Sequence, residues 1–196
     1  MDGFVVDILR GDTAIEIQTG SASGLTRKLR TLLKRHRVQL VLPIPAVRTI
    51  VRLDAASGER RTRTSPRHGT AVDVFRELVS LRDLLGDPNL SIDVVLTHER
   101  ELRTVPADPH TRRGSHREER HLIRVVDCLS FRHPADYLAV VPADLAEPFT
   151  TAELAQSIGQ PRGMAQKIAY VLRGMDVLTP TGKRGNAILY RRNVGR

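Results

Sequence analysis

The chain has 196 residues and a formal charge of +9, from 31 Lys and Arg against 22 Asp and Glu. Its 40% hydrophobic and 27% charged content is typical of a soluble globular protein with one average domain or two small ones. No apolar run approaches the roughly 20 residues of a membrane-spanning helix, and the single cysteine, Cys128, excludes a disulfide scaffold. Because no secretory signal follows Met1, we expect a cytoplasmic protein without a membrane partner.

Basic residues are concentrated at the two ends of the chain. Residues 1–69 carry 13 basic and 6 acidic side chains and residues 150–196 carry 8 and 2, whereas residues 70–149 carry 10 and 14. This segregation predicts two surfaces that contact a polyanion. Aromatic residues make up only 4% of the chain, which argues against a stacking platform for single strands. We therefore expect double-stranded DNA as the partner, and the sequence leaves open whether the chain forms a homodimer.

The first 43 residues predict a hairpin, a helix and a buried strand. The turn-forming sequence Arg10-Gly11-Asp12 separates two short apolar strands. A small polar linker follows, and then four leucines recur at the spacing of one helical stripe. A short apolar run closed by Pro43 suits a strand buried on both faces. In chain order, we expect strands at residues 4–9 and 13–18, a helix at 25–36 and a strand at 38–42.

The remaining segments before the C-terminal part predict further strands and helices. Ser57 and Gly58 supply the turn of a second hairpin, one segment has the pattern of an amphipathic helix, and two later segments also look helical. Proline, glycine, arginine and histidine residues between 106 and 117 carry loop signals and mark the predicted domain boundary. The expected elements are a hairpin at 48–53 and 60–64, helices at 72–85, 118–129 and 134–140, and a strand at 90–96.

The first hairpin carries a candidate metal site. If its turn is centred on Gly11 and Asp12, the residue numbers of each cross-strand pair add up to 23. Asp7 then lies opposite Glu16. Gln18 shares the face of Glu16, because side chains alternate along a strand. Two carboxylates placed opposite each other repel unless a cation lies between them, and oxygen ligands of this kind suit Mg²⁺. The alternative is a solvated hairpin face on which the acids have no shared role.

The order of these elements resembles the PD-(D/E)xK nuclease superfamily, which has the restriction-endonuclease-like fold. The resemblance covers residues 3–43 and extends loosely to residue 96. It implies metal-assisted hydrolysis of DNA phosphodiester bonds, with Mg²⁺ or Mn²⁺ held by Asp7, Glu16 and the carbonyl of Ile17. Gln18 would orient the attacking water. The basic helix face that approaches the DNA backbone would include Lys28 and Lys34.

Two features of the chain depart from that superfamily. Gln18 stands where most members have Lys, although some members with Gln are active. Many members also carry an acidic residue on a helix before the first strand, whereas here the first strand follows almost directly after Met1. The sequence leaves open whether the reading frame begins upstream of Met1. Both departures favour an inactive nuclease scaffold over an active enzyme.

Residues 147–192 predict two helices followed by a hairpin. Thr150 and Glu153 have the spacing of a capping box, and Gly159 ends the short helix that they start. Pro161 then opens a longer helix at its favoured first position. Two strands flank a basic, glycine-rich turn at residues 181–186. The apolar stripe of the longer helix is Met164, Ile168, Val171 and Leu172.

This arrangement resembles a winged helix-turn-helix domain over residues 118–192, with residues 118–129 as the first of three helices. The resemblance implies that the second helix of the motif enters the major groove and that the wing contacts phosphates. Arg and Gln can make bidentate contacts with bases, while Lys usually contacts phosphate. The alternative is a winged helix that contacts protein. The implied DNA-binding residues are Arg162, Gln166, Lys167 and Arg173 on the helix and Lys183 and Arg184 on the wing.

Together these features predict an α/β protein with a mixed-sheet, restriction-endonuclease-like core followed by a small winged helix-turn-helix domain. The predicted boundaries are a nuclease-like domain at residues 1–105, a linker at 106–117 and the winged helix at 118–196. The predicted function is DNA binding combined with metal-dependent endonucleolytic cleavage of DNA. The alternative is a non-catalytic DNA-binding or regulatory protein on an inactive nuclease scaffold. The layout as a whole also resembles uncharacterised bacterial proteins, which adds no function.

Overall fold

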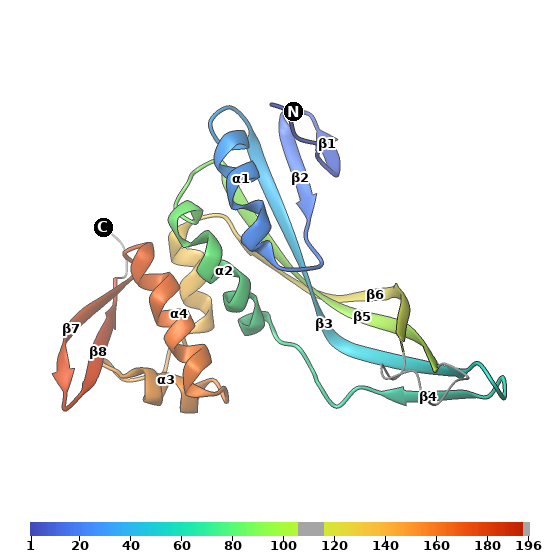
Figure 1. Ribbon diagram of the computed structural model, residues 1–196. Coiled ribbons are helices and arrows are strands. Elements are labelled where there is room, and N and C mark those ends of the chain that lie inside the picture. The colour runs from blue at the N-terminus through green and yellow to red at the C-terminus, as the bar shows by residue number, and fades with distance from the viewer. Residues whose placement is uncertain (106–115, 194–196) are drawn as a thin grey trace. The chain divides into compact units, whose positions relative to one another are not determined.

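The computed structural model describes residues 1–105 and 116–193, without the side chains of residues 116–118. The chain forms a mixed α/β structure with a six-stranded and a two-stranded sheet (Figure 1). The α/β class expected from the sequence is confirmed. None of the described helices is long and apolar enough to cross a membrane. The chain divides into two compact units: unit 1 is residues 1–42, 72–94 and 129–196, and unit 2 is residues 43–71 and 95–128.

The N-terminal hairpin of unit 1 has the register expected from the sequence. Strands β1, Ile8–Arg10, and β2, Thr13–Ile17, are antiparallel, and their three residue pairs all join positions that sum to 23. The first strand is shorter than expected, so Asp7 lies just before it. The turn geometry therefore fixes the register, as the sequence indicated.

A helix and a parallel strand follow this hairpin. The 3₁₀ turn η1, Ala22–Leu25, leads into α1, Thr26–Leu32, and the next strand, β3, runs parallel to β2 (Figure 1). A parallel neighbour needs such a crossover, because the chain must return to the same end of the sheet. Leu29 and Leu32 are fully buried, which confirms the expected amphipathic helix.

Strand β3, Arg37–Asp54, continues past the proline at which we expected it to end. It pairs with β2 near its start and with the antiparallel strand β4, Arg60–Thr64, near its end. Pro43 and Pro45 lie between these two paired stretches, so their missing N–H groups interrupt neither ladder. The hairpin expected between β3 and β4 is confirmed.

In unit 2 the strand order is β4-β3-β5-β6. Strand β5, Leu90–Val105, is longer than expected, and β6, His116–Phe131, replaces the helix expected at residues 118–129. That helix prediction is wrong, because the segment pairs with β5. The β-branched residues of the segment suit a strand, and pairing with a distant strand outweighed the apparent helical stripe. Residues 106–115 of the predicted linker lie outside the described residues.

Three helices of unit 1 pack together. They are α2, Phe75–Leu81, α3, Thr151–Ser157, and α4, Arg162–Gly174. Helix α4 contacts both α2 and α3, and it buries the apolar stripe expected from the sequence. Helix α2 thus supplies a third helix of this cluster, which we had expected from residues 118–129. The buried stripe of α4 includes Met164, Ile168, Val171 and Leu172.

The remaining elements also follow the sequence pattern. The 3₁₀ turns η2, Ala71–Val74, and η3, Arg82–Leu84, extend α2 to the length expected for its helix, and η4, Pro134–Val140, is the expected helical turn. Strands β7, Leu178–Arg184, and β8, Ala187–Arg192, form the expected antiparallel hairpin. We call this pair the β7–β8 hairpin below.

The capping box at the start of α3 is present. Thr150 Oγ1 accepts a hydrogen bond from the Glu153 N–H at 3.2 Å, and the Glu153 carboxylate accepts one from the Thr150 N–H at 2.7 Å. The bond from the Thr150 N–H and a second from the Arg184 guanidinium hold the pKa of Glu153 below its usual value. This reciprocal pair fixes where the chain enters α3.

Replacing Thr150 by Ala should lower the free energy of unfolding by about 1 kcal/mol, because the lost oxygen satisfies an N–H at the first turn of α3. Chemical denaturation followed by circular dichroism measures the change. Thr181→Ala, at an exposed position of β7, is the control and should change stability by less than about 0.5 kcal/mol. Equal stability of Thr150→Ala and the wild type would show that the capping bond contributes nothing.

Candidate nucleic-acid interface

Helix α4 exposes a polar face beside a pocket. Arg162, Gln166, Tyr170 and Arg173 are all exposed, and their spacing places them on one side of the helix. Together with residues of β8, they line a pocket of about 300 Å³. The structure thus brings together three residues that the sequence predicted to contact DNA, namely Arg162, Gln166 and Arg173.

The other residues that line this pocket, Tyr170 and Asn186 among them, were not predicted from the sequence as part of the site. Tyr170 lies one helical turn after Gln166, so the helical period alone could have assigned it to this face. Its ring lies beneath the guanidinium of Arg82, 4.6 Å from the ring centroid, in a cation–π contact. Arg82 comes from η3, so no local pattern could have placed it here. Asn186, at the turn of the β7–β8 hairpin, also lines the pocket.

The opposite side of α4 determines which residues face outward. Its apolar stripe is buried in unit 1, so the polar side must face solvent. Gly159 has φ +60°, which allows the chain to leave α3 in the left-handed conformation and turn toward α4. Pro161 then directly precedes the first residue of the helix. The outward position of the arginines therefore follows from local sequence and packing.

The other basic residues expected to contact DNA differ in their surroundings. Lys167 is half-buried on α4, and Lys183 is exposed on β7. Arg184 Nη1 lies 2.6 Å from Glu153 Oε1, so that charge is partly neutralised within the protein. Of these three residues, Lys183 on the β7–β8 hairpin is therefore the one best placed to contact a phosphate.

The predicted metal site contains an unexpected ion pair. Glu16 in β2 is 4% exposed, and its Oε2 lies 2.5 Å from Nζ of Lys28 in α1. Nζ of Lys28 also donates to the carbonyl of Val5. Burying an unpaired carboxylate costs several kcal/mol, so the ammonium of Lys28 makes the burial of Glu16 tolerable. Lys28, which we expected to face DNA, neutralises this carboxylate in the structure.

Each residue of the predicted metal site has a different partner. Asp7 Oδ2 accepts a hydrogen bond from the Ile17 N–H at 2.8 Å, and Gln18 Nε2 donates to the Ser21 carbonyl at 2.9 Å. Within the described part of the chain, no three His, Cys, Asp or Glu side chains gather as a metal site. Lys34 is exposed shortly after α1 ends.

The carboxylates fit Mg²⁺ poorly in this arrangement. Oε1 of Glu16 is buried and has no hydrogen-bond partner among the described residues, so it is the oxygen that a cation could take. The other Glu16 oxygen binds Lys28, and one Asp7 oxygen binds the backbone. Mg²⁺ requires a near-octahedral set of oxygens. These residues would meet that requirement only if Lys28 moved away from Glu16.

The described residues form an α/β protein that contains a six-stranded mixed sheet, a cluster of helices and the basic β7–β8 hairpin. The profile of the family described as "Domain of unknown function (DUF8091)" matches residues 1–132, and the chain belongs to this family. The chain is also 30% identical over 198 residues to an uncharacterized protein of Treponema pallidum (strain Nichols), with 97% of this chain and 76% of the relative covered. No solved structure matches the chain.

Replacing Lys28 by Met should lower the free energy of unfolding by about 3 kcal/mol, because Glu16 would stay buried without its cation. The double variant Glu16→Gln/Lys28→Met should lose less, since neither charge remains. Urea denaturation of Lys28→Met, Glu16→Gln and the double variant measures the coupling energy between the two residues. Lys34→Met, at an exposed position, is the control. Equal losses from Lys28→Met and Lys34→Met would mean that the ion pair does not support unit 1.

Proposed function

We propose that this chain binds double-stranded DNA through the exposed face of α4 and the β7–β8 hairpin. The observation that carries the proposal is the gathering of Arg162, Gln166 and Arg173 on the side of α4 that faces solvent. Arg can form two parallel hydrogen bonds with guanine and Gln two with adenine in the major groove. A helix that presents both side chains has the donors and acceptors needed to read base pairs.

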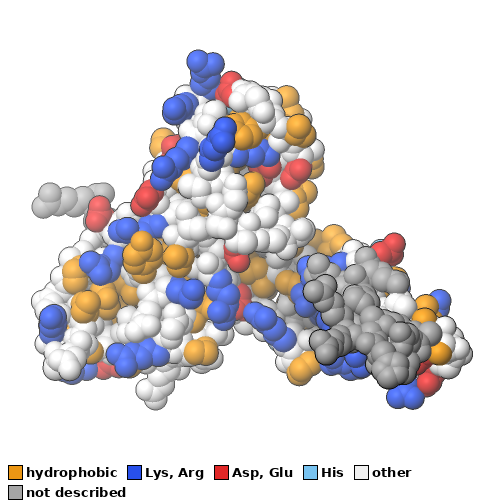
Figure 2. Space-filling model, viewed as in Figure 1, with side chains coloured by type: hydrophobic (Ala, Val, Ile, Leu, Met, Phe, Trp, Pro, Cys, Tyr) orange, Lys and Arg blue, Asp and Glu red, His pale blue; other side chains and the backbone are white. Residues whose placement is uncertain are grey.

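The charge around α4 supports a polyanionic partner. Helix α4 contains no Asp or Glu, and residues 150–196 carry 8 basic side chains against 2 acidic ones. Figure 2 shows Lys and Arg side chains over the region of α4 and the β7–β8 hairpin. Such a surface attracts phosphates and releases their condensed counterions on binding. Affinity should therefore fall steeply as salt rises.

The order of the elements supports a winged-helix mode of binding. The short α3, the turn at Gly159, the longer α4 and the β7–β8 hairpin follow one another as they do in that motif. In the proposed complex, α4 enters the major groove and Lys183 contacts the backbone beside it. A purely protein-binding role, the alternative use of such a motif, would not produce salt-dependent DNA binding.

Arg162→Gln and Arg173→Gln should each weaken binding to a DNA duplex by about tenfold, because each change removes a bidentate contact. Fluorescence anisotropy of a labelled duplex between about 50 and 200 mM salt measures the affinity and its salt dependence. Arg35→Gln, just after α1, is the matched control, since Arg35 is exposed, does not line the α4 pocket and lies 3.9 Å from Asp2 of the N-terminal segment. If all three variants bind like the wild type, α4 is not the DNA-binding surface.

Metal-dependent DNA cleavage at Asp7, Glu16 and Gln18 is a second candidate function. One observation favours it: the buried Oε1 of Glu16 lacks a hydrogen-bond partner among the described residues, which is costly unless another group binds there. The competing observation is the bond between Glu16 and Lys28, which occupies the second oxygen. The non-catalytic DNA-binding function therefore has the stronger support.

Any cleavage of DNA in the presence of Mg²⁺ or Mn²⁺ should disappear in Glu16→Gln and persist or increase in Gln18→Lys. The first change removes a charged metal ligand, and the second restores the residue common in the resembling nuclease superfamily. DNA binding measured in parallel should not change in Glu16→Gln, because α4 is a separate surface. If the wild-type chain cleaves no DNA with either ion, the second candidate fails and DNA binding alone remains.

A further inference from the structure

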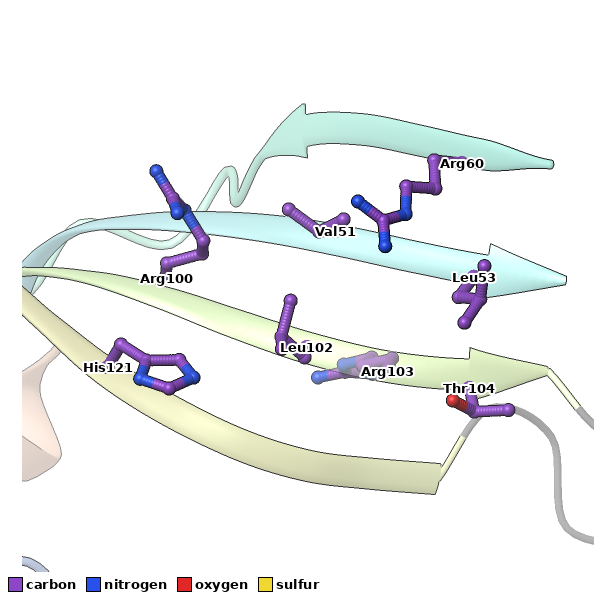
Figure 3. Close-up of a pocket in the computed structure, with 8 residues that line it drawn as sticks. All are labelled: Val51, Leu53, Arg60, Arg100, Leu102, Arg103, Thr104 and His121. Atoms are coloured by element: carbon purple, nitrogen blue, oxygen red, sulfur yellow. The ribbon is translucent and has the colours of Figure 1, made fainter. Parts of the chain in front are cut away.

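A second pocket lies on one face of the sheet in unit 2. Its volume is about 410 Å³, within the range of small-molecule sites. Val51 and Leu53 of β3 and Leu102 of β5 form an apolar floor, and Arg60 and Arg100 lie at its edges (Figure 3). His121 adds to the lining from β6, the fourth strand that borders the pocket.

Strand pairing explains why these side chains share a face. Leu53 and Arg60 are directly paired across β3 and β4, so their side chains emerge on the same side of the sheet. Thr49 and His98 are hydrogen-bonded at 3.1 Å, which aligns the same face of β3 with that of β5. Residues 51 and 53 on β3 and residues 100 and 102 on β5 then alternate onto that face.

The arginines of the opposite face have a different role. Glu99 and Glu101 alternate onto that face and are almost fully buried. Arg48 lies 3.5 Å from Glu101, Arg103 lies 2.6 Å from it, and Arg120 lies 3.2 Å from Glu99. These guanidinium groups neutralise the two buried carboxylates. Arg103 also borders the pocket, but its guanidinium is held by Glu101.

Arg60 and Arg100 have no such neutralising partner among the described residues. In residues 1–105 and 119–193, neither guanidinium forms an ion pair or a side-chain hydrogen bond, although each lies beside apolar surface. His121, which also lines the pocket, is hydrogen-bonded to Glu119 at 2.7 Å. The pocket therefore combines an apolar floor with two positive groups that have no carboxylate partner in the described part of the chain. The complementary ligand is an anion attached to an organic group.

We propose that this pocket binds a phosphate ester. The planar guanidinium groups of Arg60 and Arg100 would bind the phosphate oxygens, since Arg matches phosphate geometry with paired hydrogen bonds. The apolar floor of Val51, Leu53 and Leu102 would pack against the attached sugar or base. A free nucleotide and a nucleotide unit within a nucleic-acid strand share this chemistry. The site is separate in sequence from α4 and does not depend on the DNA-binding function proposed above.

Calorimetric titration of the full chain with inorganic phosphate, adenosine monophosphate and a short single-stranded oligonucleotide tests the proposal. Arg60→Gln/Arg100→Gln should weaken binding of the tightest ligand at least about tenfold, because both phosphate contacts are removed. Arg67→Gln is the matched control, an exposed arginine of unit 2 outside the pocket lining, and should bind as the wild type does. Thermal unfolding of each variant shows whether the chain remains folded.

Two further comparisons identify the source of the phosphate and the role of the floor. The oligonucleotide titration is repeated in Arg162→Gln/Arg173→Gln, which removes the proposed contribution of α4. Tight binding of adenosine monophosphate indicates a free nucleotide as the ligand. Binding of the oligonucleotide alone indicates a nucleic-acid strand. Either result supports the site. Leu102→Ala should weaken the binding of adenosine monophosphate and of the oligonucleotide, and it should leave the binding of inorganic phosphate unchanged. The proposal is overturned if none of the three ligands binds, or if a folded Arg60→Gln/Arg100→Gln variant binds like the wild type.

Discussion

Burial of the apolar stripe of α4 is the constraint on which the surface of unit 1 depends. Ile168 and Leu172 are fully buried, and α4 packs against both α2 and α3. Removing this apolar side from water fixes the rotation of the helix about its own axis. Arg162 and Arg173 are consequently exposed, and no hydrogen bond or ion pair with another described residue holds them. The proposed binding face of α4 thus follows from hydrophobic packing on its other side.

The arginines and lysines of the chain fall into two groups according to whether a carboxylate neutralises them. Lys28 pairs with the buried Glu16, and Arg48, Arg103 and Arg120 surround Glu99 and Glu101. These pairs compensate for the cost of burying charge, so they are explained by the fold itself. Cations that the fold leaves without carboxylates remain available to bind an anion. Figure 3 shows two such cations, Arg60 and Arg100, and α4 presents Arg162 and Arg173.

Features encoded by neighbouring residues could be predicted from the sequence. The turn centred on Gly11 and Asp12 set the register of β1 and β2, and Thr150 with Glu153 marked the start of α3. The α4 stripe was equally local, so Arg162, Gln166 and Arg173 could be assigned to one face before the structure was known. In each case the decisive contacts join residues within about ten positions, which is the range over which periodicity and turn chemistry act.

Features decided by distant contacts could not be predicted in this way. Residues 118–129 carry an apparent helical stripe, but pairing with β5 makes them a strand. The packing of α2 against α4 joins segments that lie far apart in the chain. The pocket of unit 2 needs four strands in register before Arg60, Arg100 and Leu102 share one face. Strand pairing is therefore the missing information, and no local pattern supplies it.

Binding and metal catalysis make opposite demands on the same charged groups, and the structure meets them unequally. A DNA-binding surface needs exposed cations, which α4 and the β7–β8 hairpin provide. A metal centre needs carboxylate oxygens that remain available, yet Lys28 holds one oxygen of Glu16 and the Ile17 N–H holds one of Asp7. An ammonium that already compensates a buried carboxylate removes much of the electrostatic reason for Mg²⁺ to bind there. The ion pair that stabilises this part of unit 1 is thus the feature that weighs most against catalysis at Glu16.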